Sequence, residues 1–182
     1  MQVANLIGLD PGIVDTGAVW VSLDGKEKTL HANSKVWRNV TKKAKLGIEV
    51  NQQFLDELSW YVEYATTVGV PTFVFIEGYR NRGRNPQQDQ KMTTLVQAIH
   101  KTLSGSVIVD NTGVKNVVTD ATLSLLEMDH WDIPTHHSDI KSAARILLKG
   151  AYQHEELNSL VADLVLDRLT EKQWTLTKSL AH

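Results

Sequence analysis

The stretch Asp10-Pro11-Gly12-Ile13-Val14-Asp15-Thr16-Gly17 decides the fold of this 182-residue chain. It follows a short apolar run, residues 4–9 (ANLIGL), that is typical of a buried strand. The Pro-Gly pair marks a turn that ends this strand, and the two glycines, Gly12 and Gly17, let the backbone pass close to a ligand. A second apolar run, residues 16–23, follows the turn, so the two runs predict an antiparallel pair of strands.

Hydrophobic periodicity predicts the elements that follow. A hairpin turn at Asp24-Gly25 leads into a third strand, and amphipathic helices then separate the later strands. Strands are expected over 29–37, 72–76 (TFVFI) and 106–109, and helices over 46–68, 87–103, 121–128, 138–148 and 155–169. Strands separated by helices are parallel as a rule, so we expect an α/β fold with a five-stranded mixed sheet: three antiparallel strands, then parallel ones, flanked by helices.

Length and composition limit the classes of protein that the chain can belong to. Hydrophobic residues make up 42% and charged residues 22%, which favours one folded domain over residues 1–150, with a helical extension over 151–182 packed on it. The formal charge of −2 excludes a purely electrostatic nucleic-acid binder but permits a local basic face. The absence of Cys excludes disulfides and thiol chemistry and is compatible with the cytoplasm, and no apolar run is long enough to span a membrane.

Three acidic residues stand where apolar elements begin or end. Asp10 ends the first strand, Glu77 ends the fourth, and Asp139 opens a helix. A single acid at such a position is usually a turn former or a helix cap. Three of them favour a shared site, because strand ends and helix starts meet at one edge of an α/β sheet. Carboxylates gathered there repel one another unless a hard cation binds, so we expect two Mg²⁺ ions, replaceable by Mn²⁺, that act on a phosphodiester.

The first motif resembles the D-P-G-x-x-x-T-G motif of the RuvC family of Holliday-junction resolvases, with every fixed position matched. Two further motifs fit: Glu77 in FVFIEG, and the pair His136 and Asp139, which has the H-x-x-D spacing of one branch of the family. The resemblance covers roughly residues 4–150. It implies an RNase H-like fold, hydrolysis of four-way DNA junctions in a bacterium or phage, and a catalytic, metal-binding set of Asp10, Glu77, His136 and Asp139.

The sequence departs from the family in two places. The family commonly has a basic residue before its short penultimate helix, where this chain has Thr119-Asp120, with Lys115 as the nearest lysine. Either Lys115 replaces that residue or the assistance it gives is missing. Residues 151–182 match no part of the family pattern, and their apolar positions indicate additional core or a surface for a partner.

Basic residues gather next to the proposed metal site. The loop YRNRGRNP begins directly after Glu77-Gly78, so its arginines border the acids. Arginine on a flexible loop suits phosphate binding, and a tyrosine there suits stacking on an unpaired base. The expected DNA contacts are Tyr79, Arg80, Arg82, Arg84, Lys42, Lys43, Lys141 and Arg145.

A four-way junction needs two symmetric cuts, so we expect a homodimer, with Met92, Leu95, Val96 and Ile99 serving the core and a second protomer. Two other interpretations stay open. One is a different RNase H-like nuclease, acting on RNA–DNA hybrids or flaps, which a monomer would favour. The other is a DNA-binding relative without catalytic activity, against which the complete acid set argues.

Overall fold

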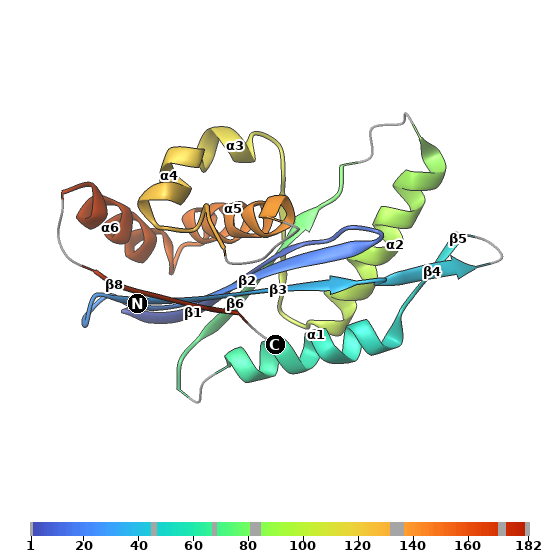
Figure 1. Cartoon of the computed structure of the whole chain (residues 1–182), viewed down its shortest axis with the longest axis horizontal. Helices are drawn as coiled ribbons and strands as arrows, with labels where there is room; N and C mark the ends of the chain where they lie inside the picture. Colours follow the sequence, from blue (N-terminus) through green and yellow to red (C-terminus); the bar gives the residue numbers. More distant parts are fainter. Residues whose placement is uncertain are drawn as a thin grey trace.

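A six-stranded mixed sheet between two layers of helices forms the body of the protein (Figure 1). The structure, a computed structural model, describes residues 2–44, 47–66, 69–80, 85–131, 137–170 and 174–180. The strands lie in the order β7-β6-β1-β2-β3-β8. Their bounds are β1 Val3–Asp10, β2 Asp15–Asp24, β3 Thr29–Arg38, β6 Thr72–Gly78, β7 Val107–Asp110 and β8 Thr175–Leu180.

The first three strands form an antiparallel meander, as the sequence predicts. The β2–β3 turn is fixed by Asp24, whose carboxylate accepts hydrogen bonds of 2.9 Å from the backbone N–H groups of Lys26 and Glu27. Strands β6 and β7 continue the sheet in parallel beyond β1, and the expected change from antiparallel to parallel strands is confirmed. The carboxyl ends of β1, β6 and β7 therefore lie at one edge of the sheet.

Two features of the chain differ from the prediction. The sheet has six strands, because β8, which follows the last helix, pairs in parallel with β3. The expected helix over 46–68 is also shorter: β4 (Thr41–Ala44) and β5 (Gly47–Val50) form a separate hairpin, and α1 (Gln52–Ala65) begins only after it. The side chain of Asn51 accepts a 3.1 Å hydrogen bond from the N–H of Gln53, which fixes the start of α1.

Each face of the sheet has its own hydrophobic core. Helices α1 and α2 (Pro86–Thr102) cover one face, and α5 (His137–Gln153) and α6 (Asn158–Leu169) cover the other (Figure 1). The short helices α3 (Val114–Val117) and α4 (Asp120–Leu125) precede α5 on its side. No helix in the described part of the chain is both long enough and apolar enough to cross a bilayer.

Helix α5 lies unusually close to the sheet. A Cβ at Gly8 of β1 would meet the carbonyl oxygen of Ala143 and would lie 2.6 Å from Cβ of Leu147. On the helix side, a Cβ at Gly150 would overlap the ring of Phe75 in β6. Because both surfaces carry glycine at this point, the backbone of α5 contacts the strands directly. A larger side chain at either position would hold the helix further from the sheet.

The apolar face of α2 belongs to the core. Leu95 and Ile99 are fully buried and Val96 is 5% exposed, all packed against the sheet and α1. The expectation that these side chains also meet a second protomer is therefore corrected, since a fully buried side chain offers no area to a partner. Of the four residues that the sequence analysis named, Met92 alone is half-buried.

We predict that Gly8→Ala lowers the free energy of unfolding by about 1–3 kcal/mol, because the added methyl group pushes against the backbone of α5. Urea unfolding measures the change. Gly25→Ala is the matched control, since its Cβ would meet only the movable Cδ1 of Leu160, at 2.8 Å, and the carbonyl oxygen of Gln2, at 3.3 Å. Equal losses in the two variants would contradict the close α5 contact.

Candidate active site

The first two acidic residues stand side by side at the ends of parallel strands. Leu9 of β1 lies opposite Ile76 of β6, and the next residues along these strands are Asp10 and Glu77. The two carboxyl groups share a hydrogen bond. The expectation that strand-end acids meet at one edge of the sheet therefore holds for this pair.

The third acid, Asp139, reaches the same place from the first turn of α5. Gly17 lies opposite Asp10 in the β1–β2 ladder, and a Cβ on it would lie 2.8 Å from the backbone carbonyl of Asp139. This glycine of the first motif therefore allows α5 to bring Asp139 next to Asp10. The Asp139 charge acts on Asp10, and Ser142, one turn further along α5, hydrogen-bonds to the Asp10 carboxyl group.

The crowding of carboxyl groups changes the protonation of Asp10. Burial raises the pKa of Asp10 from its ordinary value of 3.8 to about 9, with further contributions from the hydrogen bond and charge of Glu77 and the charge of Asp139. The hydrogen bond from Ser142 acts in the opposite direction and lowers this pKa. Without a cation, Asp10 is therefore a neutral acid at neutral pH.

The chemistry of this donor set fits a hard divalent cation, because oxygen ligands and unrelieved negative charge are what Mg²⁺ requires. Among the described residues, however, no three His, Asp or Glu side chains are placed so that they could already hold a metal ion. His136, the fourth expected ligand, lies outside the described residues. The three acids are thus close enough to interact, and metal ligation would require their side chains to rearrange.

Asn111 is a site residue that the sequence analysis missed. Its amide donates a 2.8 Å hydrogen bond to the Glu77 carboxylate from the loop after β7. The buried Lys149 of α5 holds this loop, since its Nζ donates to the carbonyl oxygens of Asp110 at 2.5 Å and Thr112 at 2.9 Å. The position of Asn111 directly after a parallel strand was a usable signal, because such strand ends border the site.

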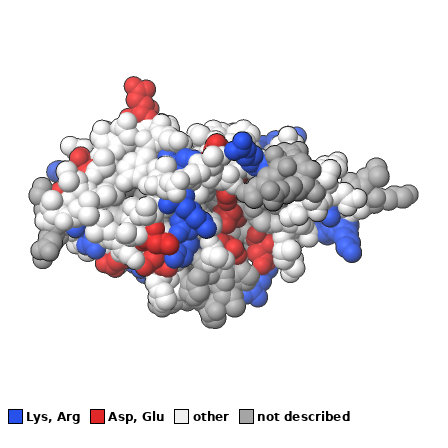
Figure 2. All heavy atoms as spheres, turned by 90° about the horizontal axis from the view of Figure 1, so that it is seen from above, with Lys and Arg blue, Asp and Glu red and all other residues white. Residues whose placement is uncertain are grey.

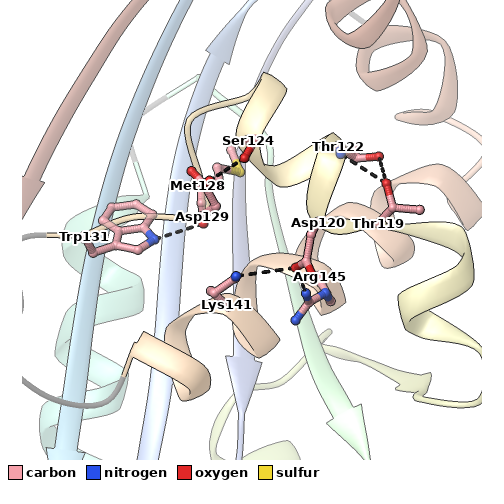
Figure 3. A network of polar contacts seen from close by, with 9 residues as sticks. All are labelled: Thr119, Asp120, Thr122, Ser124, Met128, Asp129, Trp131, Lys141 and Arg145. Atoms are coloured by element: carbon pink, nitrogen blue, oxygen red, sulfur yellow. Dashed lines mark hydrogen bonds and ion pairs between the residues drawn. The ribbon is translucent and has the colours of Figure 1, made fainter.

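The two expected DNA contacts on α5 have an acidic partner, Asp120 (Figure 3). Lys141 Nζ lies 3.4 Å from the Asp120 carboxylate, and Arg145 Nη2 donates to the same oxygen. Lys141 is half-buried, whereas Arg145 is only 8% exposed. The expectation of a solvated basic face is therefore corrected for Arg145, which lies below the surface.

The loop after β6 shows a second difference from expectation. The hydroxyl group of Tyr79 donates a 2.5 Å hydrogen bond to the buried Asp89 of α2, and its ring packs against the α1–α2 core. The ring is half-buried, and its stacking on a DNA base stays a prediction. Arg80 is exposed, and its Nη1 donates to the hydroxyl group of Thr112 at 3.2 Å. Arg82 and Arg84 lie outside the described residues.

The β4–β5 hairpin carries Lys42 and Lys43, and both side chains are exposed. It starts next to the first motif, because Thr41 donates a 2.7 Å hydrogen bond to the carbonyl oxygen of Ile13. Lys42 Nζ lies 3.2 Å from Glu49 on the paired strand. These lysines thus extend from the edge of the sheet at which the acids lie. Figure 2 shows acidic side chains in a hollow near the middle of one face, with basic ones beside them.

Comparison with known proteins supports the fold. RuvC from T. thermophilus, solved in complex with a Holliday junction substrate, matches with a TM-score of 0.51 and 15% sequence identity, covering 82% of this chain and 94% of that chain. Neither a protein-family model nor a curated protein matches the sequence. The chain has a RuvC-type, RNase H-like fold, and the fold implied by the three sequence motifs is confirmed.

We predict that Asp10→Asn stabilises the metal-free protein, and that the gain grows as the pH rises from about 4 to about 9. In this window the folded protein keeps a proton on Asp10 that the unfolded chain releases, because the pKa is raised from 3.8 to about 9. The stability of the wild type therefore falls with rising pH, and the variant does not share this loss. Thermal unfolding in EDTA at several pH values measures the difference in stability between the variant and the wild type. The control Asp163→Asn, on the exposed side of α6, should follow the wild type, and equal pH profiles for Asp10→Asn and the wild type would contradict the prediction.

Proposed function

We propose that this protein is a divalent-metal-dependent endonuclease that resolves four-way DNA junctions. The observation that carries the proposal is the meeting of Asp10, Glu77 and Asp139 at the carboxyl ends of β1 and β6 in a RuvC-type fold. RuvC from T. thermophilus, which has a similar fold, was solved with a Holliday junction substrate, and this supports branched DNA as the substrate class.

Asp10, Glu77 and Asp139, with His136, would hold Mg²⁺ or Mn²⁺. When bound, the metal supplies a Lewis acid for the phosphate and lowers the pKa of water for hydrolysis. Asp10 has to lose its proton to become a ligand, so cation binding is expected to release a proton. This requirement makes cation binding weaker at low pH.

The neighbours of the acids hold them in place. Asn111 fixes one oxygen of Glu77 from the side of β7, and Ser142 binds the Asp10 carboxyl group from α5. The hydrogen bond between Asp10 and Glu77 has to break before both side chains can become ligands. Residues from α5 and from the loop after β7 thus hold Asp10 and Glu77 before any ligand binds.

The DNA backbone is expected to lie across the basic residues around this edge. Arg80 borders Glu77 at the end of β6, and the β4–β5 hairpin carries Lys42 and Lys43 from the other side. Lys141 follows Asp139 by two residues at the start of α5. Arg82 and Arg84 extend the Arg80 loop in the sequence. Together these groups give a nearly neutral protein a basic rim around its acids, and the rim is where we place the phosphates.

A homodimer forms part of the proposal, because two symmetric cuts need two such sites at a fixed separation. The apolar face of α2 is core, so the dimer contact has to use another surface. Light scattering of the protein bound to a junction measures the oligomeric state. A monomer would instead favour a simpler RNase H-like nuclease.

We predict that Glu77→Gln lowers Mg²⁺-dependent cleavage of a synthetic four-way junction by about a thousandfold or more, while junction binding is retained. The substitution keeps the shape of the side chain and removes a ligand charge, which is worth several kcal/mol in the transition state. Gel assays with junction, flap and RNA–DNA hybrid substrates, with Mg²⁺ or EDTA, measure cleavage, and fluorescence anisotropy measures binding.

Glu156→Gln, an exposed site in the α5–α6 turn, is the control and should cleave as the wild type does. Full cleavage by Glu77→Gln would exclude the carboxylate site. Preference for hybrids or flaps over junctions would move the protein to another class of RNase H-like nuclease, and binding without cleavage would indicate a non-catalytic relative.

We predict that replacing Arg80, Arg82 and Arg84 with Ala lowers the slope of log affinity against log salt concentration by about two to three units, because each lost phosphate contact removes about one released counterion. Junction binding by the metal-free protein, measured from low to high salt, gives the slope. Lys26→Ala with Lys101→Ala is the control, since both residues lie at the opposite end of the sheet from the acids. An unchanged slope in the triple variant would place the DNA elsewhere.

A further inference from the structure

A cavity of about 540 Å³ lies directly beside the acidic residues, with Glu77 in its wall. The loop after β7 and helix α3 form one side of it, and α5 forms the other. Three basic side chains line it, Arg80, Lys115 and Arg145, and Glu77 is the one acid among its described lining residues. The cavity is therefore suited to an anionic group that approaches the acids from the side of β7.

Arg145 is the cation that this cavity holds in place. Arg145 is 8% exposed, and its Nη2 donates to Asp120, which lies in the first turn of α4 (Figure 3). Its Nε is buried and donates to no acceptor in the described part of the chain. Buried N–H groups are nearly always paired, so an arginine that is fixed on one side and keeps a spare donor beside a cavity points to a missing acceptor.

The surroundings of Arg145 are already ordered. Thr119 caps α4, since its side chain accepts from the N–H of Thr122 at 3.2 Å, and this cap fixes Asp120 at the start of the helix. Across the cavity, the contacts of Lys149 with the carbonyl oxygens of Asp110 and Thr112 hold the β7–α3 loop. Both walls are thus held by buried or capped groups, and the site needs little rearrangement to bind an anion.

We infer that this cavity is a phosphodiester subsite, in which Arg145 is the fixed cation and Asp120 is a positioning residue. The inference rests on the proposed function and deepens it: the subsite takes a phosphate of the cleaved strand next to the one that the acids act on. A non-bridging oxygen accepts from the guanidinium group of Arg145, which lines the cavity, while Lys115 and Arg80, both exposed, add positive charge at the cavity wall. Lys115 thereby serves DNA binding at a point where the sequence lacks a basic residue before α4.

The test is a binding cycle between protein and DNA. Junctions carrying one neutral methylphosphonate, at successive positions along the cleaved strand, are bound by the wild type and by Arg145→Gln in EDTA. For the wild type, we expect one position next to the cleavage point to cost about tenfold in affinity, the size of one charged hydrogen bond. Arg145→Gln should be insensitive at this position and unchanged at the others. Lys101→Gln, at the far end of α2, should keep the tenfold loss.

Asp120 is tested by the same junction series. Asp120→Asn should raise the overall affinity, because a negative charge is removed, yet lose the position-specific effect, and Asp120→Glu should restore it. A purely structural role would leave the position-specific effect intact in all folded variants. If Arg145→Gln does not fold, as thermal unfolding would show, Asp120→Asn carries the test, since Asp120 is exposed and the substitution removes the partner that positions Arg145.

Retention of the position-specific loss in the folded Arg145→Gln or Asp120→Asn variant would overturn the subsite. Because the cycle is measured without metal, its outcome is independent of cleavage. A protein that shows the coupling but cuts no junction would contradict the proposed function and support the subsite. A protein that cuts junctions without the coupling would contradict the subsite alone.

Discussion

The contact of α5 with the sheet is the constraint on which the rest of this structure depends. Gly8 and Gly150 remove the side chains that would otherwise separate helix and strands, and Gly17 does the same at the helix start. Because of this contact, Asp139 and Ser142 reach the Asp10 carboxyl group. A helix held one side chain further out would keep the fold and lose the site, so the glycines serve both packing and chemistry.

Stability and function make opposite demands on the acidic edge. Three carboxyl groups that are to bind a cation must lie close together, and their proximity is unfavourable as long as they are charged. The metal-free protein resolves this by keeping a proton on Asp10, which then shares a hydrogen bond with Glu77. In the proposed function, cation binding would relieve the same repulsion that the proton on Asp10 relieves in the metal-free protein.

The basic groups near the site are organised by long-range pairing. The formal charge is only −2, yet Figure 2 shows basic side chains beside the acidic ones near the middle of one face. Asp120, from a short helix, holds both Lys141 and Arg145 of α5. Lys149 satisfies two loop carbonyl groups from within the core. Several cations that appear to be free in the sequence therefore have fixed partners within the fold, and these partners determine where each cation lies.

The sequence by itself determined the strand meander, the parallel strands and the pairing of Asp10 with Glu77. Apolar periodicity shows which face of an element is buried, and the ends of parallel strands meet at one edge whatever the details of packing. It did not find β8, because one short alternating run does not show which strand it will pair with. The sequence analysis began α1 too early. The β4–β5 hairpin occupies residues whose apolar spacing also suits a helix.

Tertiary structure alone decided which partner each buried or half-buried polar side chain binds. Tyr79 binds Asp89, Asn111 binds Glu77, and Arg145 lies buried beside Asp120. Each of these partners comes from a different element, and no local spacing in the chain encodes such a contact. The hydrophobic pattern specifies layers, whereas a buried polar group takes whichever partner the packed layers bring within hydrogen-bonding distance.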